Sequence, residues 1–141
     1  MGALPSGNLY IGYSIMRVFK FRVWDKTQKK MYYPEEFGEQ FAIGIGGTLA
    51  KRYICDDTIN CYEDNYIIQP YIGSQDKNGK DIYEGDLCNF ICCTPNLEVV
   101  YYESCYYCIP SNTPIDDNSC RFNEFDTKEC LVIGNICENQ K

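Results

Sequence analysis

The stretch QDKNGKDIYEGDL, residues 75–87, holds two turn signals between segments that resemble strands. Asn78-Gly79 is a strong short-range signal for a β-hairpin, because both residues adopt positive φ at little steric cost. Gly85, flanked by two acidic residues, predicts a second turn a few positions later. Two tight turns this close make the chain reverse direction twice, so the middle of the protein is expected to be antiparallel β structure.

Segments rich in aromatic and β-branched residues recur along the rest of the chain. Thirteen Tyr, seven Phe and one Trp favour pleated, half-buried surfaces. The alternation in 19–24, the polar turn residues after it and Met31-Tyr32-Tyr33 predict a hairpin, and Pro34 opens a short helix. A long acidic loop is expected at 110–129. Further strands are expected at 66–73, 87–93, 97–102, 105–109 and 131–137. The predicted fold class is therefore all-β with minor α structure.

Composition predicts a globular protein of ordinary solubility. The chain has 141 residues, 45% of them apolar and 23% charged, enough for one compact domain or two small lobes. No apolar run approaches the length that spans a bilayer, and the opening residues carry no basic start of a secretory signal. We therefore expect a cytoplasmic protein with no membrane partner.

The charge is distributed unevenly, which defines one candidate binding surface. Residues 17–30 hold six basic residues and one acidic residue, whereas residues 31–141 hold seven basic and nineteen acidic residues. A cationic strip with an exposed aromatic ring suits single-stranded nucleic acid, and the remaining acidic surface would repel phosphates. The alternative, which we favour, is a solvated strand face whose lysines prevent stray strand pairing. The candidate nucleic-acid-binding residues are Lys20, Arg22, Trp24, Lys26, Lys29 and Lys30.

The acidic cluster of the middle segment has two interpretations. Its carboxylates, with Asp81 and Glu84 among them, could form an acid/base pair or a site for a hard metal ion. The other interpretation is turn chemistry, since Asp beside Gly or Asn-Gly bonds the backbone of its own turn. We favour the second interpretation, so no metal ion is expected here. The predicted structural turn motif is Asp76, Asn78, Gly79, Gly85 and Asp86.

Other routes to catalysis are weak. The sequence has no histidine, which removes Ser-His-Asp and Cys-His catalysis and every mixed Cys/His zinc site. The glycines of 44–47 match neither a dinucleotide fingerprint nor a P-loop. We therefore expect no catalytic residues, no cofactor and no enzymatic activity.

All ten cysteines lie between Cys55 and Cys137. In a reducing cytoplasm they are expected to be small buried thiols, with structural disulfides and a four-cysteine metal site as alternatives. Cys105 and Cys108 form the sole C-x-x-C spacing, and on a regular strand they point to opposite faces. The adjacent pair at 92–93 is expected to diverge in the same way. Zinc is therefore the minority interpretation.

Three segments together resemble the YopX family of small phage and prophage proteins: KFRVWDKTQKKMYY, IGSQDKNGKDIYEGD and VIGNICEN. The resemblance implies a β-rich fold of two lobes, the second a small SH3-like barrel. It also implies self-association and a phage-infected or lysogenic bacterial host, but no particular biochemical activity. The expected limits are a flexible tail or upstream extension at 1–15, an N-terminal lobe at 16–74 and the barrel at 75–141. The cysteine content and the loop at 110–129 depart from the family pattern.

The leading functional hypothesis is a non-enzymatic phage accessory protein that self-associates and works through protein contacts. It depends on the resemblance, on the lack of a catalytic constellation and on Tyr-rich strands, which suit interfaces. The first alternative is nucleic-acid binding through the basic hairpin at 17–30. The second alternative is a small-molecule-binding protein of the anti-defence type, with a pocket between the lobes.

Overall fold

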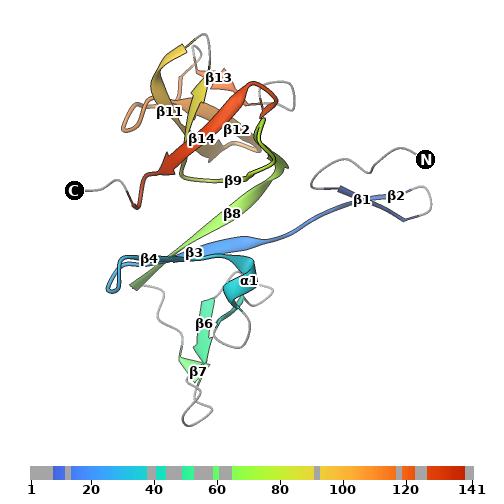
Figure 1. Ribbon diagram of the computed structural model, residues 1–141, viewed down its shortest axis with the longest axis vertical. Coiled ribbons are helices and arrows are strands. Elements are labelled where there is room, and N and C mark those ends of the chain that lie inside the picture. Colours follow the sequence, from blue (N-terminus) through green and yellow to red (C-terminus); the bar gives the residue numbers. More distant parts are fainter. Residues whose placement is uncertain are drawn as a thin grey trace. The chain divides into compact units, whose positions relative to one another are not determined.

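The computed structural model describes residues 8–11, 14–37, 41–43, 49–52, 59–60, 65–90, 93–116, 119–122 and 127–138. The described residues are mostly strand and the strands pair antiparallel, so the all-β prediction is confirmed (Figure 1). The chain forms two compact units, one of residues 20–69 and one of residues 70–141 with 1–19. The lobe limits expected from the sequence remain predictions. None of the helices described is long and apolar enough to cross a membrane.

The unit of residues 20–69 is built around the predicted hairpin. Strand β3 pairs with β4 in the register Val23↔Tyr32, and β3 lies between β4 and β8 in its sheet. The predicted short helix is present as α1. The buried core of this unit consists of Val23, Tyr32 and Phe41. The ring centroids of Tyr32 and Phe41 are 5.0 Å apart. The elements are β3 (Phe21–Asp25), β4 (Lys30–Tyr32), α1 (Pro34–Phe37), β5 (Phe41–Ile43), β6 (Leu49–Arg52), β7 (Ile59–Asn60) and β8 (Tyr66–Gln75). The glycines of 44–47 lie outside the described residues.

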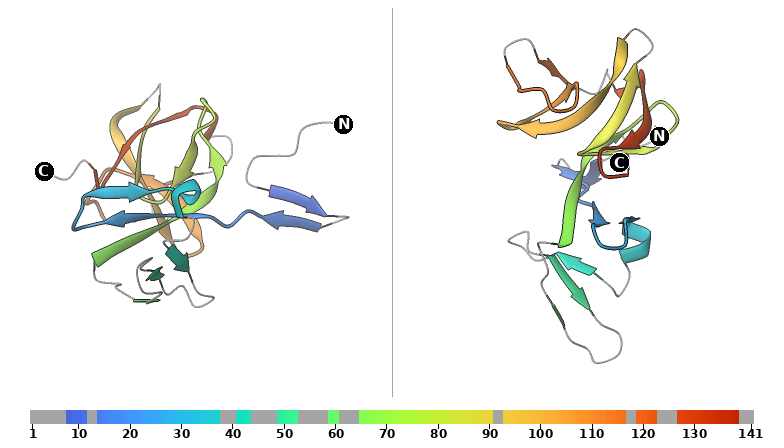
Figure 2. Two further views of the ribbon diagram at one scale, coloured as in Figure 1. Left: turned by 60° about the horizontal axis from the view of Figure 1, so that its bottom comes forward. Right: turned by 90° about the vertical axis from the view of Figure 1, so that its left-hand side faces the viewer.

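The unit of residues 70–141 contains a five-stranded antiparallel sheet in the order β13-β12-β11-β10-β14. The sheet curls around its own core (Figure 2). The strands are β9 (Asp81–Tyr83), β10 (Asp86–Phe90), β11 (Cys93–Tyr102), β12 (Cys105–Ile109), β13 (Cys120–Arg121) and β14 (Cys130–Asn135). The core consists of Ile82, Cys88, Val99, Cys108, Cys130 and Val132. Barrel-like curling agrees with the resemblance, and the finer SH3-like assignment remains a prediction.

Two segments differ from the expectation. The predicted loop at 110–129 contains β13, whose register pairs Cys120 with Cys108 and Arg121 with Tyr107. Within the segment expected to be a tail, β1 (Asn8–Ile11) pairs antiparallel with β2 (Ser14–Arg17). Neither segment shows the alternation of polar and apolar residues that predicts a strand, because two to four residues are too few to carry a period.

Candidate functional site

The acidic turn between β8 and β9 forms the hairpin that Asn78-Gly79 predicts, with a loop of three residues. The Asp76 amide donates to the Lys80 carbonyl at 2.8 Å, and the Gly79 amide donates to the Asp76 carbonyl at 3.0 Å. Gly79 has a φ of +81°, whereas Asn78 is not in the left-handed region. These features describe a three-residue hairpin loop that ends in a glycine bulge. Of the two residues that can adopt a positive φ here, only Gly79 does so.

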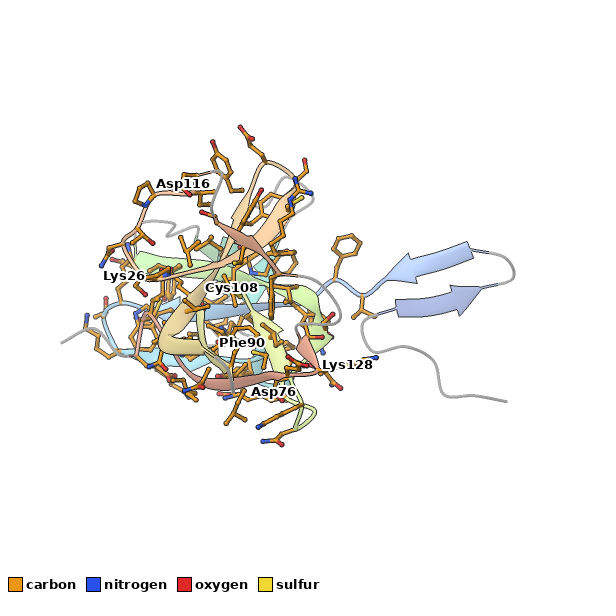
Figure 3. All side chains as sticks on the ribbon, turned by 90° about the horizontal axis from the view of Figure 1, so that it is seen from above. Lys26, Asp76, Phe90, Cys108, Asp116 and Lys128 are labelled. Atoms are coloured by element: carbon orange, nitrogen blue, oxygen red, sulfur yellow. The ribbon has the colours of Figure 1, made fainter. Side chains whose placement is uncertain are left out.

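The Asp76 carboxylate holds both its own turn and a distant strand. Its Oδ1 accepts hydrogen bonds from the amides of Asn78 and Lys80, each at 2.9 Å. Its Oδ2 accepts from the Val132 amide on β14 at 3.0 Å, 56 residues along the chain. The Lys77 amide also donates to the Cys130 carbonyl at 3.1 Å. Asp76 is only 6% exposed, so this side chain closes the turn onto an edge strand of the sheet (Figure 3).

The second turn is tied to the sheet in a similar way. Gly85 has a φ of +86°; its amide donates to the Val99 carbonyl and its carbonyl accepts from the Ile136 amide, both at 2.9 Å. The buried Asp86 carboxylate accepts from the Tyr83 amide at 2.8 Å. Backbone amides thus occupy acceptor sites on both buried carboxylates, which ties these groups to the protein's own chain.

Asp81, another acidic residue of the cluster, contacts a side chain of the preceding strand. The half-buried Asp81 accepts a hydrogen bond from the Gln75 side-chain amide at 3.0 Å. Over the described ranges, no three or more His, Cys, Asp or Glu side chains are grouped so that they could hold a metal ion. The acidic motif therefore has the geometry of a structural clasp.

The predicted aromatic and cationic strand face is not at the surface. Arg22 is 1% exposed and Trp24 5% exposed, and the Arg22 Nε donates to Gln69 Oε1 at 2.7 Å. Alternation correctly separates the two faces of β3, yet Val23 on the opposite face is buried as well. Burial of both faces comes from segments elsewhere in the chain, so a polar side chain on a strand does not imply exposure. The face of Arg22 and Trp24 is therefore neither an open stacking surface nor the solvated, edge-protecting face that we favoured, and both interpretations are wrong for these two residues.

The loop after β3 keeps the cationic character that the sequence predicts. Lys26, Lys29 and Lys30, named here the basic loop, are exposed. The Asp25 carboxylate shapes this loop by accepting from the amides of residues 27 and 28. Lys30 Nζ lies 3.5 Å from a Glu36 carboxylate oxygen. It also lies 4.5 Å from the centre of the Tyr32 ring. Lys20 is half-buried. Nucleic-acid binding by these lysines remains a prediction.

Six described cysteines are free thiols, and most of these fill the core. The six are Cys88, Cys105, Cys108, Cys120, Cys130 and Cys137. Cys88 and Cys130 are fully buried, and Cys108 and Cys137 are nearly so. A hydrogen bond with Cys130, together with burial, raises the pKa of Cys88 far above its usual range. A thiol with a raised pKa is a poor nucleophile and a poor metal ligand in its protonated form. Cys120 on β13 is the exposed one among these six thiols.

Sequence reasoning missed an exposed aromatic surface on β11 and β12. Tyr101, 54% exposed, pairs with Tyr106 across the two strands, and their ring centroids are 5.1 Å apart. Tyr102, 46% exposed, has its ring centroid 6.5 Å from that of Tyr107. We name these four residues the tyrosine hairpin. The repeated Tyr-Tyr pairs of YYESCYY are its signal in the sequence, because such pairs place one ring on each face of a strand.

Charged side chains lie beside the rings of the tyrosine hairpin. The negative charge of Glu103 and its hydrogen bond raise the pKa of Tyr102. On the neighbouring strand, a hydrogen bond to Tyr107 raises the pKa of Arg121. The hairpin thus presents ring surfaces together with one acidic and one basic group, an arrangement suited to another protein surface.

A family model described as YopX protein matches residues 20–141 of the chain. The chain belongs to the YopX family. The resemblance found in the three sequence segments is thereby confirmed. The YopX match covers the acidic motif, the basic loop and the tyrosine hairpin, and it begins after β2. No curated protein matches the chain.

Two solved structures resemble this YopX chain. Protein EF1440 from Enterococcus faecalis is 24% identical, with a TM-score of 0.50 over 86% of this chain and 95% of that one. Protein yopX from Bacillus subtilis is 19% identical, with a TM-score of 0.54 over 85% of this chain and 94% of that one. At these identities the likeness shows a shared fold.

Proposed function

We propose that this YopX-family chain is a non-enzymatic accessory protein of phage or prophage origin that self-associates and acts through protein contacts in its host's cytoplasm. The observation that carries the proposal is the exposure of Tyr101 and Tyr102 on the β11–β12 hairpin. Tyrosine supplies a large apolar area with a polar end, and it is enriched at protein interfaces. Rings left half exposed on a rigid strand pair are therefore well suited to contact another protein.

The fate of the acidic motif supports the non-enzymatic part of the proposal. The carboxylates of Asp76 and Asp86 are buried and accept backbone amides. A general base needs a lone pair within reach of a substrate proton, and these groups direct theirs toward the protein's own chain. The sequence also has no histidine, the commonest general base at neutral pH.

Self-association is tested by measuring mass in solution. Multi-angle light scattering after gel filtration, at micromolar concentration and at two salt concentrations, should show a defined oligomer. Sedimentation equilibrium over a tenfold concentration range provides an independent mass. A strict monomer in both measurements would overturn the self-association proposal.

Nucleic-acid binding is a second candidate, and the exposure of Lys26 and Lys29 favours it. Lysines that contact phosphate release counterions, so the binding constant should fall with salt by a slope of about −0.7 per contact. Replacing both lysines with Glu should then abolish retention on single-stranded DNA at low salt. Absence of retention for the unmodified protein would remove this candidate.

A further inference from the structure

The tyrosine hairpin extends past the core of its own unit. Val99 on β11 and Cys108 on β12 are a buried cross-strand pair. Two residues further along each strand, on the same face, stand Tyr101 and Tyr106. Tyr101 is more than half exposed, so the strand pair carries its core-facing side beyond the last buried layer. Tyr106 is half-buried against the core, whereas the described residues of this unit leave more than half of the Tyr101 ring exposed.

The turn of this hairpin is strained. Tyr102 pairs with Cys105, and the two residues between them, Glu103 and Ser104, have φ values of +43° and +70°. Gly or Asn occupies both central positions of such turns at much lower cost. Backbone strain held by non-glycine residues tends to occur where the side chains serve a contact.

The basic loop has the same feature. Lys29 has a φ of +55°. The other described non-glycine residue with a positive φ is Asn112, and Asn tolerates the left-handed backbone conformation. Among the described residues, the costly positive φ values therefore lie on the tyrosine hairpin and the basic loop. The two surfaces therefore share one feature, a backbone strain that glycine would avoid.

The tyrosine hairpin and the basic loop lie in surroundings of opposite charge. Residues 70–141 carry twelve acidic and five basic side chains, a net charge of −7, and Glu98 and Glu103 lie on the strands and turn of the hairpin. The basic loop contributes three lysines within five positions. Lys30 already lies over a tyrosine ring, Tyr32, with its Nζ 4.5 Å from the ring centre. Cation–π contact of this kind is what the exposed rings could offer to further lysines.

We propose that the tyrosine hairpin of one copy receives the basic loop of a second copy, in a head-to-tail contact. The inference depends on the self-association proposed above and adds which surfaces meet. Two different patches form such an interface, so each copy uses both, and repetition closes a ring or continues as a chain. Because Tyr101 and Tyr102 stand on opposite faces of the strand pair, Lys26 and Lys29 of the second copy lie on either side of the hairpin end, one over each ring, with Glu103 between them.

The test uses two variants of the full chain. The hairpin variant is Tyr101→Ser with Tyr102→Ser, and the loop variant is Lys26→Glu with Lys29→Glu. Each should weaken self-association by about 30-fold or more, the loss expected for hot-spot residues. Each variant alone has a damaged patch at every contact, so both should be monomers. Mixed together, they should form a one-to-one dimer, because the hairpin variant retains its loop and the loop variant retains its hairpin.

Controls separate this geometry from general effects. Lys77→Glu with Lys80→Glu makes the same charge change at two exposed lysines elsewhere, and it should leave the oligomer intact. Ile133→Ser removes another exposed apolar side chain, 45% exposed, and should also have no effect. Near-ultraviolet circular dichroism establishes that each variant is folded. If the double serine variant is not folded, Tyr102→Lys takes its place, since it keeps a long side chain and adds repulsion.

Each outcome decides between the claims. An unmodified protein that is monomeric overturns both the proposed self-association and the head-to-tail contact. If the unmodified protein is an oligomer and either variant remains one, the head-to-tail contact is wrong while self-association stands. If both variants are monomers and their mixture stays monomeric, the two patches do not meet and the inference is likewise overturned. A one-to-one dimer from the mixture supports it.

Discussion

Replacing Asp76 with Asn separates the two tasks of its carboxylate. Asn can still accept the amides of residues 78 and 80 through its remaining oxygen, because Asn and Asp form the same kind of turn. Its NH₂ group would then replace Oδ2, which accepts the buried Val132 amide at 3.0 Å. Two donors would face each other between the turn and β14. Asp76→Ala removes all three acceptor contacts together.

The magnitude follows from these contacts. A buried amide left without its acceptor costs about 1–3 kcal/mol, so Asp76→Asn should lower the free energy of unfolding by about 2 kcal/mol. The two turn amides lie at the surface, where water can replace the carboxylate, and each adds about 0.5–1 kcal/mol in the Ala variant. Asp76→Ala should therefore lower the free energy of unfolding by about 3–4 kcal/mol. That is a large part of the roughly 5–15 kcal/mol by which a folded domain is typically stable.

Urea unfolding followed by circular dichroism measures these losses, and amide hydrogen exchange at Val132 localises the effect. Asp81→Asn is the matched control, since Asp81 is half-buried in the same hairpin and its carboxylate accepts from the nearby Gln75 side-chain amide. It should change stability by less than about 1 kcal/mol. If Asp76→Asn loses less than about 0.5 kcal/mol and Val132 exchange is unchanged, the carboxylate does not clasp β14.

Three other expectations concern the tyrosine hairpin and the thiols. Glu103→Asn with Ser104→Gly relieves the positive φ values and should raise the free energy of unfolding by about 1 kcal/mol, seen as a higher melting temperature; a lower one would show that the turn is not strained. Glu103→Gln removes the charge that raises the pKa of Tyr102, so the phenol should titrate at lower pH by NMR, and an unchanged titration would contradict that cause. The exposed Cys120 should alkylate within minutes at pH 8, whereas the buried Cys88 should react at least about 1,000-fold more slowly until urea unfolds the protein; equal rates would refute its burial.

The strands could be predicted from the sequence because their segments are rich in aromatic and β-branched residues. Segments 105–109 and 66–73 have this composition, and β12 and β8 occupy them. The alternation in 19–24 likewise predicted a strand, but it could not predict which face of β3 is covered. Arg22 and Trp24 share a face that looks amphipathic in sequence, yet burial depends on what packs against a strand from elsewhere in the chain.

The acidic motif shows a different limit. The choice of turn chemistry over catalysis follows from Asp beside Asn-Gly, and the carboxylate of Asp76 does accept the amides of its turn. Its bond to Val132 connects positions 56 residues apart, and no local pattern encodes such a contact. The loop type also escaped prediction, because Asn-Gly fits both a two-residue turn and the end of a three-residue loop.

The turns of the chain fall into two kinds, and the division bears on function. Where a turn serves the fold, glycine takes the positive φ: the Gly79 amide closes its own turn onto the Asp76 carbonyl, and Gly85 bonds Val99 and Ile136. At Glu103, Ser104 and Lys29 the same region of φ is held by residues with long or polar side chains, at a cost that glycine would avoid. Stability alone would favour replacing these side chains. Their presence on an aromatic and a cationic surface is what a contact between copies would require, since the energy lost in the turn is then recovered by the interface.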